Sequence, residues 1–314
     1  MRTMLVNVAT RLIVGAALAG ACGPSPARAT APAAGQKTFS TPEQAAHALI
    51  DAAERFDVAA LTEILGPDGV DLVITEDAVQ SKNQGAAFAA EAREKTAIVR
   101  DSGNAKIAIL SVGAEAWPMP IPIVESRGAW RFDTKAGRQE LLHRRIGSNE
   151  LDAIEVCRGY VEAQHEYALE KHDGSDVNQY AKRIVSTPGR QDGLAWKAPD
   201  GTWQGPVGES IARVIAEGYT GRYEPYHGYY FKVLKGQGSA APLGTLDFVV
   251  GGAMIGGFAL VASPADYGVT GVKTFLVSHD GVVYERDLGS KTLESFRMMD
   301  RFNPDASWSP VEAP

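Results

Sequence analysis

The sequence predicts an α+β protein of two domains, because helical patterns and strand patterns follow one another in separate blocks, and do so twice. Residues 40–146 run from helices to strands, and residues 147–311 open on a long helical pattern that gives way to strands and turns. The chain beyond its N-terminal segment, about 270 residues, is long enough for two ordinary domains.

Residues 1–29 are predicted to be an export signal. Arg2 and Arg11 supply positive charge, and the apolar run Leu12–Ala21 is too short to span a bilayer as a helix. The first acidic residue is Glu43. The predicted location is therefore the periplasm or the outer-envelope surface.

Two cleavage sites compete within this segment. Ala27-Arg28-Ala29 would release a soluble chain that starts at Thr30, whereas Ala19-Gly20-Ala21-Cys22 resembles a bacterial lipoprotein box, which would leave Cys22 lipidated. Only the second alternative gives the protein a membrane contact, through the lipid anchor. Residues 30–39, rich in Pro, Ala and Gly at their start, are predicted to be a linker.

The charge balance argues against nucleic acid as a partner. The chain has 31 Lys and Arg against 38 Asp and Glu, a net charge of −7. Removal of residues 1–29 takes away three Arg and no acid, which leaves 28 basic and 38 acidic residues and a net charge of −10. A protein this acidic is not built to hold a polyanion by charge.

The first block begins with two capped helices. Thr41 precedes Pro42 and a helical pattern, with Gln44 placed for a capping box, and Asp57 starts a short helix that ends at Gly66-Pro67. A third helix is expected over about residues 77–100, followed by strands over residues 106–112, 120–124 and 129–133.

This order of helices and then a curved antiparallel sheet resembles the nuclear transport factor 2-like cone, over about residues 40–140. The resemblance implies an enclosed pocket, and some members of that fold are enzymes while many only bind or scaffold. A cone enzyme is expected to hold an Asp/His or Asp/Tyr pair in the pocket. His47, on the first helix, is interpreted as a partly exposed structural histidine.

The second block is predicted to begin with a helix capped by Asn149, with acids in its first turn, that stops near residues 172–174. Two shorter helices are expected over residues 208–216 and 292–299. Between them, Phe258–Ala262, Val272–Ser278 and Val282–Tyr284 read as strands, the last two joined at Asp280-Gly281, which favours a tight hairpin.

This block resembles the globular head of a type IV pilin or pseudopilin. The resemblance is carried by Ala163-Gln164-His165-Glu166-Tyr167 in the helix and by a spaced set in the strands: Ala262, Pro264, Gly268, Thr270, Gly271, Phe275, Asp280 and Gly281. It implies a helix packed across an antiparallel sheet. The long apolar helix that packs the core of a pilus fibre has no counterpart in this block.

The whole chain, over about residues 38–311, is similar to a bacterial family, domain of unknown function 2950. The stretch WRFDTKAGRQELLHRRIGSNEL and the block from Gly228 to Gly289 carry this similarity. It implies an exported bacterial protein with these two halves, and it assigns no catalytic residue and no cofactor.

One segment is predicted to be a recognition patch, because aromatic side chains on a loop give rigid contact area at small entropic cost. It comprises Tyr223, Tyr226, His227, Tyr229 and Tyr230, near Tyr219. An envelope protein or a glycan would be the partner. The alternative is that the same side chains pack against the edge of the sheet.

No set of residues predicts catalysis, a metal or a cofactor. His165 and His172 are seven residues apart, whereas zinc ligands on one helix lie three or four apart. Cys157 lies within a helical pattern and reads as a small buried apolar residue. The sequence therefore indicates a non-catalytic binding or assembly module, with small-ligand binding or hydrolysis in the first domain as the alternative.

Overall fold

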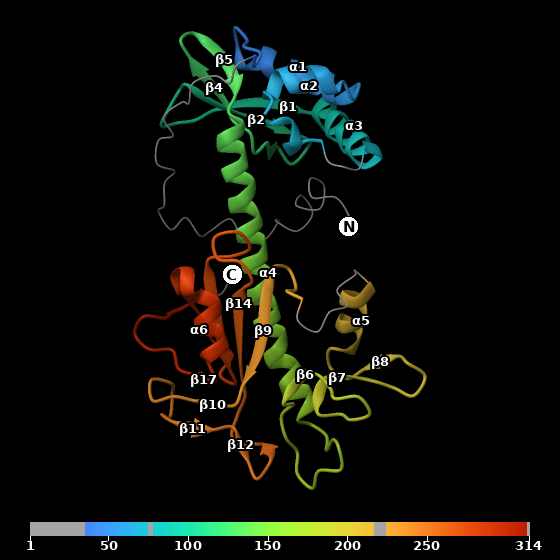
Figure 1. The fold of residues 1–314 in the computed structure, drawn as a ribbon, viewed down its shortest axis with the longest axis vertical. Coiled ribbons are helices and arrows are strands. Elements are labelled where there is room, and N and C mark those ends of the chain that lie inside the picture. Colours follow the sequence, from blue (N-terminus) through green and yellow to red (C-terminus); the bar gives the residue numbers. More distant parts are fainter. Residues whose placement is uncertain (1–34, 75–77, 217–223, 313–314) are drawn as a thin grey trace. The chain divides into compact units, whose positions relative to one another are not determined.

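The computed structural model describes residues 35–74, 78–216 and 224–312. It confirms the α+β class, since helices and mainly antiparallel sheets form separate blocks along the chain (Figure 1). Contacts divide the chain into two compact units, the first ending at His143 and the second beginning at Arg144. The predicted signal lies outside the described residues. None of the helices in the described ranges is both long and apolar enough to cross a bilayer.

The first unit begins with three α-helices and one 3₁₀ turn, namely α1 (Pro42–Glu54), α2 (Val58–Leu65), η1 (Val70–Leu72) and α3 (Ala78–Glu94). Both predicted caps are confirmed. The Thr41 hydroxyl accepts a hydrogen bond from Gln44 N, and Asp57 accepts one from Ala60 N. The Gln44 side chain accepts from Ser40 N, one residue before the position that a capping box requires.

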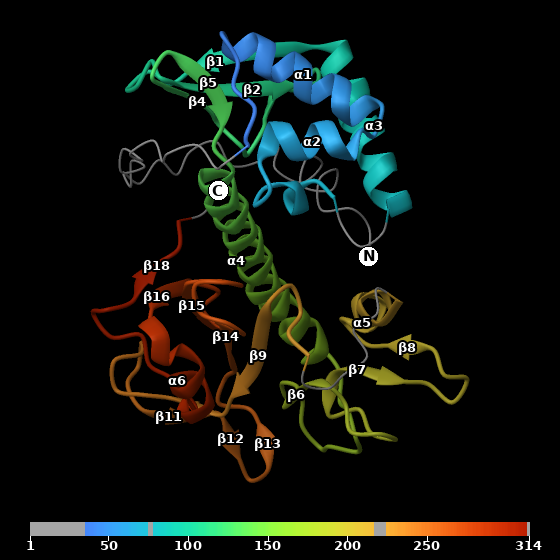
Figure 2. The same cartoon turned by 45° about the horizontal axis from the view of Figure 1, so that its top comes forward.

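The strands of the first unit form one antiparallel sheet. The strands are β1 (Thr96–Arg100), β2 (Ile107–Val112), β3 (Trp117–Pro118), β4 (Ile123–Ser126) and β5 (Ala129–Phe132), in the order β1-β2-β4-β5 with β3 beside β2. The three helices lie together against this sheet (Figure 2). Leu110, Ile123 and Phe132 are fully buried between the two layers.

The predicted end of the third helix at Arg100 is wrong. Helix α3 ends at Glu94, and residues Thr96–Arg100 form β1, which pairs with β2. Thr96, Ile98 and Val99 are β-branched and favour an extended backbone, so the local preference changes at this point. The helical periodicity of the preceding residues therefore ends at Glu94.

The predicted helix start at Asn149 is also wrong, because α4 runs without a break from Thr134 to Tyr167. Asn149 and Glu150 serve a different purpose from capping. The Asn149 side-chain amide donates to Thr270 O, and one Glu150 carboxylate oxygen accepts from Val272 N and Lys273 N. These side chains bind a loop that is distant in sequence. The residue types that predicted a helix start are therefore present because they make tertiary contacts.

The main sheet of the second unit is antiparallel, with the order β18-β16-β15-β14-β9. Its strands are β9 (Tyr229–Leu234), β14 (Ala259–Pro264), β15 (Lys273–Ser278), β16 (Val283–Asp287) and β18 (Ser309–Pro310). The hairpin at Asp280-Gly281 is confirmed: β15 pairs with β16, and Gly281 has a φ of 76°, in the region that glycine favours.

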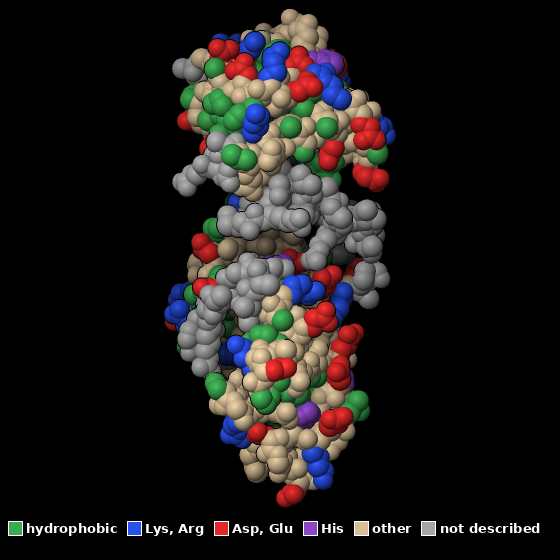
Figure 3. All heavy atoms as spheres, turned by 90° about the vertical axis from the view of Figure 1, so that its right-hand side faces the viewer, with side chains coloured by type: hydrophobic (Ala, Val, Ile, Leu, Met, Phe, Trp, Pro, Cys, Tyr) green, Lys and Arg blue, Asp and Glu red, His purple; other side chains and the backbone are tan. Residues whose placement is uncertain are grey.

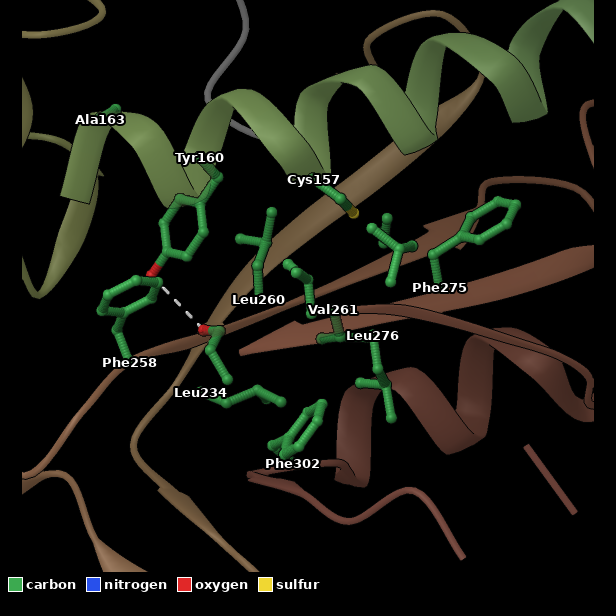
Figure 4. Close-up of a cluster of buried hydrophobic side chains, with 14 of the residues drawn as sticks. Cys157, Tyr160, Ala163, Leu234, Phe258, Leu260, Val261, Phe275, Leu276 and Phe302 are labelled. Atoms are coloured by element: carbon green, nitrogen blue, oxygen red, sulfur yellow. Dashed lines mark hydrogen bonds between the residues drawn. The ribbon is translucent and has the colours of Figure 1, made fainter. Parts of the chain in front are cut away.

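Side chains bury the central strands of this sheet on both faces, since every residue of β14 is buried (Figure 4). Cys157 and Tyr160 point from α4 onto one face, while Phe302 and Leu276 lie on the side of α6 (Thr292–Met298). The predicted helix across an antiparallel sheet is therefore present, with a second layer beneath it.

Smaller elements complete the second unit. A sheet of β6 (Arg183–Val185), β7 (Gly193–Lys197) and β8 (Trp203–Gln204) packs with α5 (Gly208–Ala216), whose bounds match the prediction. The others are β10 (Gly236–Gln237), β11 (Leu246–Asp247), β12 (Val249–Val250), β13 (Ala253–Met254), η2 (Gly289–Lys291) and β17 (Arg301–Phe302). Acidic and basic side chains are interspersed on the face of each unit seen in Figure 3.

Candidate functional site

The first unit contains a pocket of about 100 Å³ between its helices and the chain that follows β2. Side chains from α1, α2, α3, β2 and β3 line it, together with residues of η1, the segment after β3 and the start of α4. The lining is Leu49, Ala53, Phe56, Leu61, Leu72, Val73, Ser81, Gln84, Gly85, Phe88, Glu91, Val112, Trp117, Met119, Pro120, Ile121 and Leu141.

A close approach of α1 and α3 shapes one wall of the pocket. A Cβ atom at Gly85 would lie 2.9 Å from the carbonyl oxygen of Ala53, so only glycine allows this separation without a shift. Phe56, just after α1, adopts a φ of 51°, which is rare for a bulky residue. The backbone of Phe56 is held there by a hydrogen bond from its N–H to Ala53 O.

The polar side chains of the lining all come from α3. Ser81, Gln84 and Glu91 recur at helical spacing around Phe88, so they share one helix face. Ser81 is buried, Gln84 is half-buried and Glu91 is exposed. This stripe was missed in the sequence, although its periodic spacing was the signal that would have revealed it.

The chemistry of this pocket suits binding. The lining is apolar and aromatic apart from those α3 side chains, and Glu91 is the one ionisable side chain among the described lining residues. General acid–base hydrolysis requires two groups that face each other across the reacting bond. His47 lies on α1 but is exposed and is not part of the lining.

The predicted recognition patch is divided by the structure. Tyr219 and Tyr223 lie outside the described residues. Tyr229 is fully buried, its hydroxyl donates to Lys273 O at 2.9 Å, and its ring lies beside Phe275. Its assignment to an exposed patch is therefore wrong: at this position the side chain belongs to the sheet core, and burial raises the pKa of its phenol.

The other patch members within the described residues, Tyr226, His227 and Tyr230, are half-buried. Tyr226 and Tyr229 pair across a two-residue turn in which His227 and Gly228 both have positive φ, as in a type I′ hairpin. The His227 ring stacks on Tyr226, with 4.1 Å between centroids, and Tyr230 stacks on Phe296. A recognition role for Tyr226, His227 and Tyr230 stays a prediction.

The same turn brings an imidazole and a carboxylate together. His227 Nδ1 lies 2.5 Å from an oxygen of Asp152, which α4 supplies next to Asn149 and Glu150. The contacts of Asn149, Glu150 and Asp152 fix the His227 turn and the loop at residues 270–273 against one helix. The pocket described above belongs to the first unit and includes none of them.

The remaining candidates are structural, and His172 lies beyond the helix, because α4 ends at Tyr167 rather than near residues 172–174 as predicted. Cys157 is fully buried, and desolvation raises the pKa of its thiol to about 12, so the prediction of a buried apolar residue is confirmed. His172 is buried, stacks on Tyr167 and makes a hydrogen bond with Tyr167 O. His165 lies against Tyr180 and Phe258.

Comparison with known proteins places most of the chain in one family. The family described as "Protein of unknown function (DUF2950)" matches residues 36–311. No curated protein and no solved structure matches the chain. The likeness to nuclear transport factor 2-like cones and to pilin heads therefore stays a prediction.

Proposed function

We propose that this chain, which belongs to the DUF2950 family, is an exported bacterial envelope protein that binds a small apolar ligand in the pocket of its first unit and catalyses no reaction on it. The observation that carries this proposal is the lining of the pocket. It combines apolar and aromatic side chains from most elements of the unit with a few polar groups from one helix. That composition is typical of small-molecule sites.

The size of the pocket restricts the ligand. Pockets for drug-sized molecules enclose about 300–1,000 Å³, whereas this one encloses about 100 Å³. An apolar cavity of about 150 Å³ accepts benzene. We therefore expect a ligand no larger than one ring, or the apolar end of a longer molecule.

Filling the pocket should weaken the binding of benzene. Ala53→Leu adds three carbon atoms to a lining side chain, so we expect the affinity for benzene, measured by calorimetric titration, to fall by on the order of tenfold or more. Ala59→Leu is the matched control, because Ala59 is exposed on α2 and is not part of the lining.

Met119→Trp fills the pocket from another wall, and it provides a second test if the Ala53→Leu protein does not fold. Circular dichroism establishes that each variant is folded before it is titrated. Equal benzene affinities for the wild type and both filled variants would contradict the proposal, as would a wild type that binds no benzene.

Export is the second part of the proposal, and it is supported by residues 1–29 alone. Mass spectrometry of the membrane and soluble fractions of expressing bacteria should find a mature N-terminus at acylated Cys22 or at free Thr30. A Cys22→Ala variant distinguishes these alternatives, because it leaves the Thr30 form unchanged and removes the acylated one. Recovery of the chain with Met1 intact in the cytoplasm would refute export.

A further inference from the structure

Glu91 gives the pocket a negative charge at its exposed side. Its side chain is exposed while most of the lining is buried or half-buried. The backbone at this point is well fixed, because Glu91 O accepts from both Gly113 N and Lys95 N. A Cβ atom on Gly113 would lie 3.6 Å from a Glu91 carboxylate oxygen, so the carboxylate lies beside the turn between β2 and β3.

Neither of the two basic residues nearest to Glu91 along the chain forms an ion pair with it. Lys95, one turn after Glu91, directs its ammonium group to Ala114 O at 3.4 Å. Arg93 forms ion pairs with Asp51 and Glu54 on α1. Within the described ranges, the Glu91 carboxylate has neither an ion pair nor a side-chain hydrogen bond.

We infer that the ligand of this pocket is a small amphipathic cation, with its apolar body inside and its ammonium group at Glu91. This inference rests on the proposed function and specifies its ligand class. A carboxylate at the edge of a low-dielectric surface attracts a cation more strongly than one in open water does, and it repels an anion. Phe88, one turn before Glu91, and Trp117 supply aromatic faces of the kind that bind ammonium groups.

The net charge of −7 favours the same class of ligand, since an acidic protein concentrates cations near its surface. Gln84 adds a neutral amide to the lining, two turns before Glu91, and that amide has no hydrogen bond within the described ranges. It would accept or donate one hydrogen bond to a polar group on the ligand.

Three probes with a common phenyl group separate the charge preference from pocket binding itself. They are benzylammonium, the neutral benzyl alcohol and the anionic phenylacetate. Each is titrated by calorimetry into the wild type, Glu91→Gln and Glu94→Gln. Glu94 is the matched control, because it is exposed on the same helix and is absent from the lining.

The wild type should bind benzylammonium about three- to tenfold more tightly than benzyl alcohol, and phenylacetate most weakly. Glu91→Gln should remove that preference, so that benzylammonium binds no more tightly than benzyl alcohol, while Glu94→Gln keeps it. Raising the salt from about 10 mM to about 300 mM should weaken only the binding of benzylammonium.

Two outcomes overturn the inference, and they differ in their meaning for the proposed function. If benzyl alcohol binds but Glu91→Gln leaves the order of affinities unchanged, the cation preference fails and the apolar site stands. If no probe binds the wild type, both fail together.

Discussion

Replacing Gln164 with leucine should lower the free energy of unfolding of the second unit by about 3–5 kcal/mol. Gln164 is fully buried on α4 and joins the helix to Ala181, since its oxygen accepts from Ala181 N and its amide donates to Ala181 O, both at 2.8 Å. The amide also donates to the Tyr160 hydroxyl at 2.8 Å. Leucine would leave all three partners buried without these hydrogen bonds.

Urea unfolding of the two proteins measures this loss, and hydrogen exchange at the Ala181 amide locates it. Glu166→Leu is the control on the same helix, because Glu166 is exposed and its replacement should change stability by no more than about 0.5 kcal/mol. A Gln164→Leu protein as stable as the control would show that the hydrogen bonds of Gln164 contribute little to stability.

Gly271→Ala should destabilise the second unit by about 3 kcal/mol, because the added methyl group has no space. A Cβ atom at Gly271 would lie 2.2 Å from the Tyr229 hydroxyl oxygen and 2.6 Å from the adjacent ring carbon. Tyr229 is fully buried and bonded to Lys273 O, so the ring must move within the core and lose that bond.

Thermal unfolding, monitored by circular dichroism, tests this prediction. The control is a substitution that is expected to raise the unfolding temperature. Gly159 lies within α4 with nothing near its added Cβ, so Gly159→Ala should stabilise the protein by about 0.5–1 kcal/mol. If Gly271→Ala raises the midpoint temperature of unfolding as Gly159→Ala does, Tyr229 does not pack closely against Gly271.

Gln164 and Gly271 both belong to the residues that carry the resemblance to a pilin head, and the structure gives each a physical role. Gln164 and Tyr167 bind backbone atoms of Ala181 and Gln191, which ties α4 to the segments that follow it. Gly271 makes room for Tyr229. These residues therefore hold α4 to the chain that follows it and allow the Tyr229 ring to pack, and they say nothing about assembly.

Features that depend on neighbours in the chain could be predicted from the sequence. Thr41 and Asp57 cap helices, α5 has the predicted bounds, and Asp280-Gly281 turns a hairpin, because each signal lies within a few residues of its effect. Asn149 misled the prediction because its amide binds Thr270, far along the chain.

The pocket could not have been assembled from the sequence. Its lining extends from Leu49 to Leu141, and which of those apolar side chains face a cavity depends on how α1, α3 and the sheet pack. The burial of the aromatic residues near the start of β9 could not be predicted from the sequence either. Tyr229 and Tyr230 are adjacent, yet one is core and the other half-exposed, because successive strand residues face opposite sides.

Methyl NMR during a titration with benzene tests the central claim, that the first unit holds a binding pocket. The signals of Leu49, Leu61 and Val112, which line the pocket, should shift with a single dissociation constant. Those of Leu260 and Val261, in the core of the second unit, should stay unchanged. Unchanged signals from the lining at saturating benzene, or shifts confined to the second unit, would contradict the account.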